Sequence, residues 1–160
     1  MKKLQIILMT SCMLLLLIAC NSYKGVSGYY SYEVECIGNQ MDGVQVLKAW
    51  GSGSSMKMAI EAAKKEAIDA LLFKGIRKGK SVCSMKPIIV KVNAKEVYAD
   101  YFESFYGKRG LYKKFVKTTK QGFLKKSSTS SNDGNVSYSV TVYVDIKKLK
   151  RQLINDNILQ

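Results

Sequence analysis

Two stretches of the chain alternate apolar and polar residues, which is typical of half-buried β-strands. Tyrosine, valine and cysteine alternate with serine and glutamate from Tyr30 to Cys36, and valine and tyrosine alternate with serine and threonine from Val136 to Val144. A period of two places one set of side chains on each face of a strand. We therefore predict a strand at each place, with one face buried.

Turn sequences beside these stretches predict two hairpins. Met41-Asp42-Gly43 precedes a returning strand from Val44 to Trp50, and Asn132-Asp133-Gly134-Asn135 follows a strand that continues to about Lys126. Asparagine or aspartate before glycine favours a tight turn between two strands. The segment from Tyr112 to Val116, where the second of these hairpins begins, is open between a short helix and a strand.

The clearest helix follows the sequence Gly51-Ser52-Gly53-Ser54-Ser55. Apolar residues recur on one helical face from Met56 to Leu71, a serine offers the N-cap, and Gly75 is placed to end the helix. The two glycines before it are interpreted as the tight turn between strand and helix. Small side chains on the apolar face allow the helix axis to lie close to a sheet, and four of them are alanines, namely Ala59, Ala63, Ala67 and Ala70.

The remaining pattern predicts one more strand and two more helices. A basic loop over 77–86 and a short strand over 88–92 lead to a second helix, where Asn93 and Glu96 form a capping-box pattern. This helix ends near Gly107 and Gly110, and its apolar side is expected in the core, with ligand binding as the alternative. That side consists of Val97, Tyr98, Tyr101, Phe102 and Phe105. The final short helix has its apolar side at Ile146, Leu149 and Leu153.

These elements predict an α+β domain with the order β-β-α-β-α-β-β-α. Two hairpins and helices with one apolar side favour an antiparallel or mixed sheet of about five strands. Two main helices lie on one face of it, and a short helix follows at the C-terminus.

The first nineteen residues carry the marks of a secretory signal peptide. Lys2 and Lys3 precede an apolar stretch from Leu4 to Ile18, which is short for a permanent membrane span of about 20 residues. The sequence Leu17-Ile18-Ala19-Cys20 resembles the lipobox of bacterial lipoproteins. The resemblance implies cleavage between Ala19 and Cys20 and fatty acylation of Cys20. An uncleaved anchor that happens to contain a cysteine is the alternative.

The resemblance also implies a division of the chain and a location. Residues 1–19 would be the signal peptide, 20–28 a lipidated tether, and 29–160 a single domain. Asn21 follows the cysteine where an aspartate would signal retention at the inner membrane, and no acidic cluster follows Cys20. We therefore expect an outer-membrane lipoprotein whose domain faces the periplasm rather than the cell surface. Stable anchoring needs more than one acyl chain, which lipobox processing would supply.

The positive charge bears on the partners of such a protein. Without Lys2 and Lys3, 24 of the 26 basic residues remain against 12 acidic ones, so the processed chain carries a net charge of +12. This balance favours anionic partners such as lipid phosphates or acidic envelope polymers. No nucleic-acid-binding signature is present, and no nucleic-acid partner is expected. The alternative is that the lysines only solvate the surface.

The final helix and two cysteines are further candidates. Four cations, Lys147, Lys148, Lys150 and Arg151, flank the final helix and are candidates for contact with anions or the membrane. Their alternative role is to complement the helix dipole. Cys36 and Cys83 remain after Cys20, and an exported chain permits a disulfide between them. Cys36 is also interpretable as a small buried apolar residue.

Catalytic and cofactor patterns are missing from the sequence. The chain has no histidine, which excludes serine–histidine and cysteine–histidine nucleophiles and the usual zinc ligand sets. Glu96, Asp100 and Glu103 share one side of the second helix and are interpreted as a solvated face. The glycines before the first helix match neither phosphate-binding pattern in full. We therefore expect no enzyme activity, no metal and no cofactor.

One further resemblance concerns the predicted domain. The residues Trp50-Gly51-Ser52-Gly53 and the helix alanines resemble a small twenty-kilodalton lipoprotein family and the N-terminal domain of flagellar T-ring proteins. The resemblance covers about 44–76 and implies an envelope-anchored α+β module.

Three functional hypotheses follow. The first is a non-enzymatic envelope module that binds a protein or an anionic envelope polymer. The second is a structural subunit of a ring or secretion assembly, joined through sheet edges. The third is a hydrolase of envelope polymers that uses Glu96 or Asp100.

Overall fold

The computed structural model describes residues 33–83, 85–118 and 136–159. The signal peptide, Ala19, Cys20 and the tether lie outside the described residues. The predicted turn at 132–135 and the predicted strand beyond Thr118 also lie outside them.

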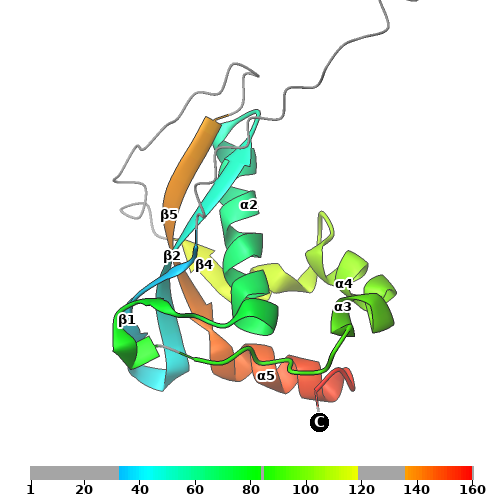
Figure 1. Ribbon diagram of the computed structural model, residues 1–160. Helices are drawn as coiled ribbons and strands as arrows, with labels where there is room; N and C mark the ends of the chain where they lie inside the picture. Colours follow the sequence, from blue (N-terminus) through cyan, green and yellow to red (C-terminus); the bar gives the residue numbers. More distant parts are fainter. Residues whose placement is uncertain (1–32, 84, 119–135, 160) are drawn as a thin grey trace, which may run out of the picture. The chain divides into compact units, whose positions relative to one another are not determined.

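A mixed sheet of five strands forms one layer (Figure 1). Its order is β3-β1-β2-β5-β4, with β3 parallel to β1 and all other neighbours antiparallel. The predicted α+β fold class is confirmed. The strands are β1 (Glu35–Gln40), β2 (Val44–Gly53), β3 (Lys78–Gly79), β4 (Val116–Thr118) and β5 (Val136–Asp145).

The hairpin of β1 and β2 confirms the first predicted turn. A 3₁₀ turn spans Met41–Gly43, and both Asp42 and Gly43 have positive φ angles of 69° and 81°. Aspartate and glycine tolerate this left-handed conformation better than most residues. The first strand is described from Glu35, whereas Tyr30 to Tyr32 of the predicted strand lie outside the described residues.

Helix α2 (Met56–Asp69) covers one face of the sheet, as the alanine pattern predicts (Figure 1). The Ser55 hydroxyl accepts a hydrogen bond from the Met58 amide at 3.4 Å and caps the helix. A π-helical turn (Ala70–Lys74) continues the helix, and Gly75 ends it with a φ of 78°. The predicted start and end are confirmed.

Gly51 and Gly53 have a different role from the one predicted. They are not in a turn but belong to β2, where they pair with Tyr138 and Val136 of β5. A Cβ atom on Gly51 would overlap the Ala59 carbonyl oxygen and the Ala63 amide nitrogen of α2. Glycine is therefore required because the helix backbone lies directly on the strand, with only alanines between them.

The predicted strand over 88–92 is wrong. Its first two amides instead donate to the end of the preceding helix, Ile88 to the Leu71 carbonyl (3.0 Å) and Ile89 to the Leu72 carbonyl (2.9 Å). The last carbonyls of a helix lack partners within the helix, so an extended segment can satisfy them. The third strand in the sequence is instead β3, inside the predicted basic loop.

The second helical region is broken in two. Helix α3 (Ala94–Val97) and helix α4 (Ala99–Tyr106) are separated at Tyr98, whose φ and ψ are −114° and 33°. The predicted capping box is wrong, because Asn93 has a φ of 56° and its side chain makes no cap hydrogen bond. The segment after Gly110, for which the sequence did not decide between a short helix and a strand, forms a 3₁₀ turn (Leu111–Lys114) and then enters β4.

Helix α5 (Ile146–Asn155) completes the described fold. The Asp145 carboxylate accepts a hydrogen bond from the Lys148 amide at 2.9 Å and caps the helix. Leu149 and Leu153 are fully buried, as predicted. The core therefore lies between the sheet and α2 (Figure 1), extends to α5, and includes the contact of α4 with the π-helical turn that follows α2.

Candidate functional site

Aromatic rings fix the second helical region against the π-helical turn and against the segment that leads into β4. The Phe102 ring lies 5.1 Å from that of Phe73, and the Phe105 ring lies 6.2 Å from that of Phe115. Both Phe102 and Phe105 are buried. The aromatic side of this helix is therefore core, as predicted, although Val97 at its start is 56% exposed.

Carboxylates of α2 hold the same region by polar contacts. Glu61 accepts hydrogen bonds from the Tyr112 hydroxyl and the Lys64 ammonium, both at 2.7 Å. Burial raises the pKa of Glu61, but these bonds and the positive charges of Lys64 and Lys113 together lower it by more, so its pKa lies below the usual value. Asp69 pairs with Lys95 at 2.6 Å and with Lys74 at 3.5 Å. These acids already serve the packing of the helices.

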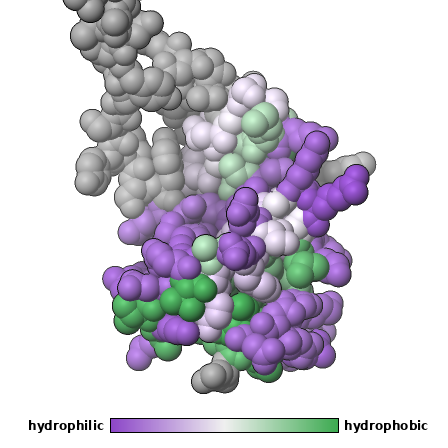
Figure 2. Space-filling view, turned by 90° about the vertical axis from the view of Figure 1, so that its right-hand side faces the viewer, coloured by the Kyte–Doolittle hydropathy of each residue, from purple (hydrophilic) through white to green (hydrophobic). Residues whose placement is uncertain are grey.

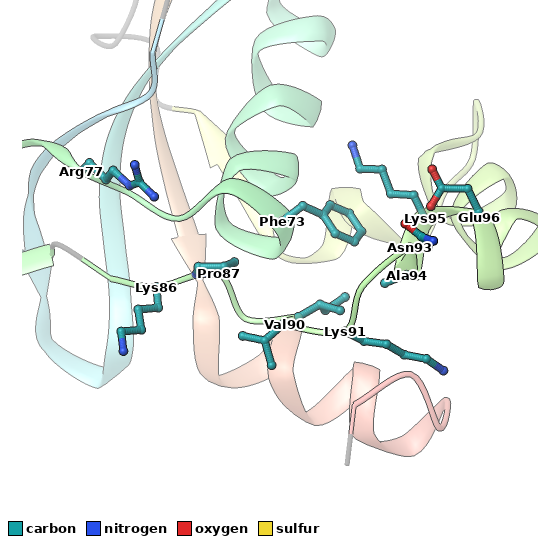
Figure 3. A pocket seen from close by; sticks show the side chains of 11 residues that line it. Phe73, Arg77, Lys86, Pro87, Val90, Lys91, Asn93, Ala94, Lys95 and Glu96 are labelled. Carbon is teal, nitrogen blue, oxygen red and sulfur yellow. The ribbon is translucent and has the colours of Figure 1, made fainter.

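A hollow opens between the end of α2 and the segment that follows the basic loop (Figure 3). Its volume is about 650 Å³. Phe73 contributes its ring from the π-helical turn, and Pro87, Ile89, Val90 and Ala94 supply the other apolar lining.

Four cations surround this apolar lining: Arg77, Lys86, Lys91 and Lys95. Lys95 lies over the Phe73 ring at 4.7 Å, and Lys91 lies over the Tyr98 ring at 4.8 Å. No ion pair joins Arg77 or Lys86 to any carboxylate of the described residues. The one carboxylate of the lining is that of Glu96, and Lys95 is paired with Asp69 beside it, so the excess positive charge of the hollow comes from Arg77, Lys86 and Lys91.

Exposed valines continue from the hollow onto the surface. Val90 is 77% exposed, Val92 81% and Val97 56%. Apolar and charged patches adjoin over the lower part of the face that carries α3 and α4 (Figure 2). We call residues 86–97 the Lys86–Val97 segment. It presents three exposed valines among three lysines.

The predicted candidates fall at separate places. Cys36 and Cys83 form a buried disulfide, with their Cα atoms 5.9 Å apart. The cations Lys147, Lys148, Lys150 and Arg151 are exposed along α5, with Lys148 paired to Asp145 at 2.9 Å. They do not line the hollow.

The acidic residues of the second helical region are divided between the hollow and the open surface. Glu96 borders the hollow, whereas Asp100 and Glu103 are exposed outside it. Within 33–83, 85–118 and 136–159, no group of three or more histidine, cysteine, aspartate or glutamate side chains could hold a metal ion. The sequence prediction missed the Lys86–Val97 segment, because its lysines look the same in sequence whether they bind a partner or only meet solvent.

Comparisons with known proteins identify no relative. No family model, no curated protein and no solved structure matches the chain. None of the helices in the described part of the chain has the length and apolar character needed to cross a membrane.

Proposed function

We propose that this protein is a lipid-anchored module of the bacterial cell envelope that binds an anionic partner and catalyses no reaction. The observation that carries the binding part is the hollow, whose apolar lining is surrounded by four cations and bordered by one carboxylate. An apolar site with convergent charges is the usual form of a binding site. Anchoring rests on the lipobox at Leu17-Ile18-Ala19-Cys20.

The disulfide supports export of the domain. Disulfides persist in the periplasm and outside the cell, and they are rare in reducing cytoplasm. Cys36 and Cys83 are both buried, and their bond joins β1 to the 3₁₀ turn Ser81–Cys83. A structural disulfide of this kind fits a chain that folds after export through the predicted signal peptide.

The sheet edges give less support to a structural subunit that assembles by strand addition. Edge strand β3 consists of Lys78 and Gly79, and Lys80 follows it directly. Edge strand β4 carries an exposed lysine, Lys117. Short edges with lysines resist pairing with another chain. A hydrolase is less supported because Asp100 and Glu103 lie apart from the hollow.

Metabolic labelling with an alkyne fatty acid tests the anchoring part of the proposal. We expect the full chain to take up label and to be cut before Cys20, and Cys20→Ser to lose both. Cys12→Ser is the matched control, because Cys12 lies in the same apolar stretch and should leave with the signal peptide. Labelling that survives Cys20→Ser would contradict the proposal.

Binding is tested by cross-linking envelopes of cells that produce the full chain. We expect capture of an anionic envelope component, with a yield that falls when the salt concentration rises, because salt screens exposed charges. Capture that is insensitive to salt, or absent, would contradict the binding part.

A further inference from the structure

We infer that the Lys86–Val97 segment is a second, reversible membrane contact, which docks on the anionic lipid surface to which the protein is anchored. In this contact the valines enter the interface and the lysines lie at the lipid phosphates. The inference deepens the proposed function and rests on it, because it names the anionic partner as the lipid surface itself.

The first step is the exposure of the valines. Val90 and Val92 are each more than three-quarters exposed, although they follow the buried pair Ile88 and Ile89. Single exposed apolar residues are common, but here three fall within eight residues of one segment, and concentrations of exposed apolar residues mark interaction sites.

The second step is the charge around the valines. Lys86 and Lys91 extend from the segment on either side of Val90, away from Phe73 (Figure 3). Lysine is depleted in the cores of protein–protein interfaces, which favour aromatic residues, methionine and arginine. Basic residues beside an anionic leaflet are instead attracted to it, and long lysine side chains place their charge at the interface while their stems lie on apolar surface. The composition therefore favours a lipid surface over a protein.

The third step is reach. Twelve residues separate Cys20 from Glu33, where the described domain begins. Fully extended, this connection spans at most about 45 Å. A compact domain of this size has a radius of gyration of about 14 Å and therefore a diameter of about 36 Å. The tether is long enough for the Lys86–Val97 segment to be turned towards the membrane.

Photo-crosslinking of the full chain in its own envelopes tests the contact. A diazirine side chain is placed at position 92 or, as a control, at position 58, where Met58 is 56% exposed near the start of α2. We expect phospholipid adducts at position 92 to exceed those at position 58 at least fivefold. Equal yields at the two positions, or adducts at 92 with protein alone, would overturn the inference.

Charge variants test the role of the lysines in the same background. Each cation near an anionic leaflet contributes about 1 kcal/mol, which is about fivefold in an equilibrium constant. We expect Lys86→Gln with Lys91→Gln to reduce the adducts at position 92 at least fivefold, whereas Lys57→Gln, on the exposed first turn of α2, leaves them unchanged. An unchanged yield in the Lys86/Lys91 variant, or an equal loss in the Lys57 variant, would overturn the inference.

The same samples separate this inference from the anchoring proposal, because the fatty-acid label on Cys20 is scored beside the adducts. Label on Cys20 without excess adduct at position 92 would refute the contact and leave the anchoring intact. Excess adduct at position 92 without label would refute the anchoring and leave the contact intact.

Discussion

Removing the disulfide is expected to destabilise the domain strongly. Cys36 and Cys83 are separated by 47 positions, and their bond closes this stretch into a loop that restricts the conformations of the unfolded chain. For a closed loop of this length, the chain-entropy model gives about 4 kcal/mol of stabilisation at 25 °C. The replacement Cys36→Ala with Cys83→Ala retains both Cβ atoms, so most of the loss should come from the unfolded chain.

This free energy corresponds to a measurable shift in melting temperature. The unit Tyr32–Gln160 should unfold with an entropy of about 2.1 cal/mol/K per residue, or about 0.27 kcal/mol/K in total. A loss of about 4 kcal/mol therefore lowers Tm by about 15 °C. Thermal and urea unfolding of the purified protein, followed by circular dichroism, would measure both quantities.

Reductant supplies the control for this experiment. Both cysteines are buried, so reductant should reach the disulfide of the unmodified protein only after partial unfolding. It should have no effect on the variant in which both cysteines are replaced by alanine. A decrease in Tm of less than about 4 °C, equivalent to about 1 kcal/mol, would refute the entropic reasoning. Two free thiols in the protein purified from envelopes would refute the bond itself.

Three further predictions concern the packing around α2, and denaturant unfolding checks each of them. Gly51→Ala should lower the free energy of unfolding by about 3 kcal/mol or more, because the new Cβ atom would overlap the backbone of α2. In the control Gly38→Ala, the new Cβ atom has nothing within 4 Å, so the change should be less than about 0.5 kcal/mol; similar effects of the two variants would contradict the close approach. Tyr112→Phe should destabilise the protein by about 1.5 kcal/mol, because it removes the hydrogen bond to the Glu61 carboxylate. Tyr106→Phe should be neutral or stabilising, because the buried Tyr106 hydroxyl has no hydrogen-bond partner among the described residues; the reverse order of the two effects would contradict this account. Stability should fall as the pH drops below about 5, because the folded-state pKa of Glu61 lies below its usual 4.5 and protons therefore bind more readily to the unfolded chain. Glu61→Gln should weaken this pH dependence, and an unchanged slope of the unfolding free energy against pH would contradict the prediction.

Local sequence patterns were sufficient to predict the helices and strands in which buried side chains recur at a regular spacing. The alternation from Val136 to Val144 lies within β5, and the apolar side from Met56 to Leu71 lies within α2 and the π-helical turn. In both cases the buried positions follow the period of the element itself. Neighbours in sequence therefore carry the information needed to predict them.

Contacts between distant segments explain the errors. A short apolar run such as 88–92 is compatible with a strand, but its amides meet carbonyls that become free only where α2 ends. Gly51 resembles a turn residue in the sequence, and only the approach of Ala59 and Ala63 shows why glycine is needed within β2. Neither partner is adjacent in the chain, so no local pattern specifies it.

The candidate site was hidden for a related reason. Valine in an apolar run is expected to be buried, and Ile88 and Ile89 follow that expectation while Val90 and Val92 do not. Which of these apolar residues are buried depends on how the end of α2 covers the segment. The spacing of Lys86, Lys91 and Lys95 was visible in the sequence, but the lysines alone do not distinguish a binding surface from a solvated one.

The way in which the valines are held bears on how strongly the segment must bind. Hydrogen bonds from Ile88 and Ile89 to the end of α2 fix one side of it, and α3 begins on the other. A surface that is already ordered loses little conformational entropy on docking. In the proposed lipid-anchored form, a short tether would hold the domain at an effective concentration in the millimolar range, so an affinity of about 4 kcal/mol would be enough for the docked state to be well populated. Partial burial of three valines together with the attraction of the lysines supplies this amount, although neither would hold the domain on a membrane without the anchor.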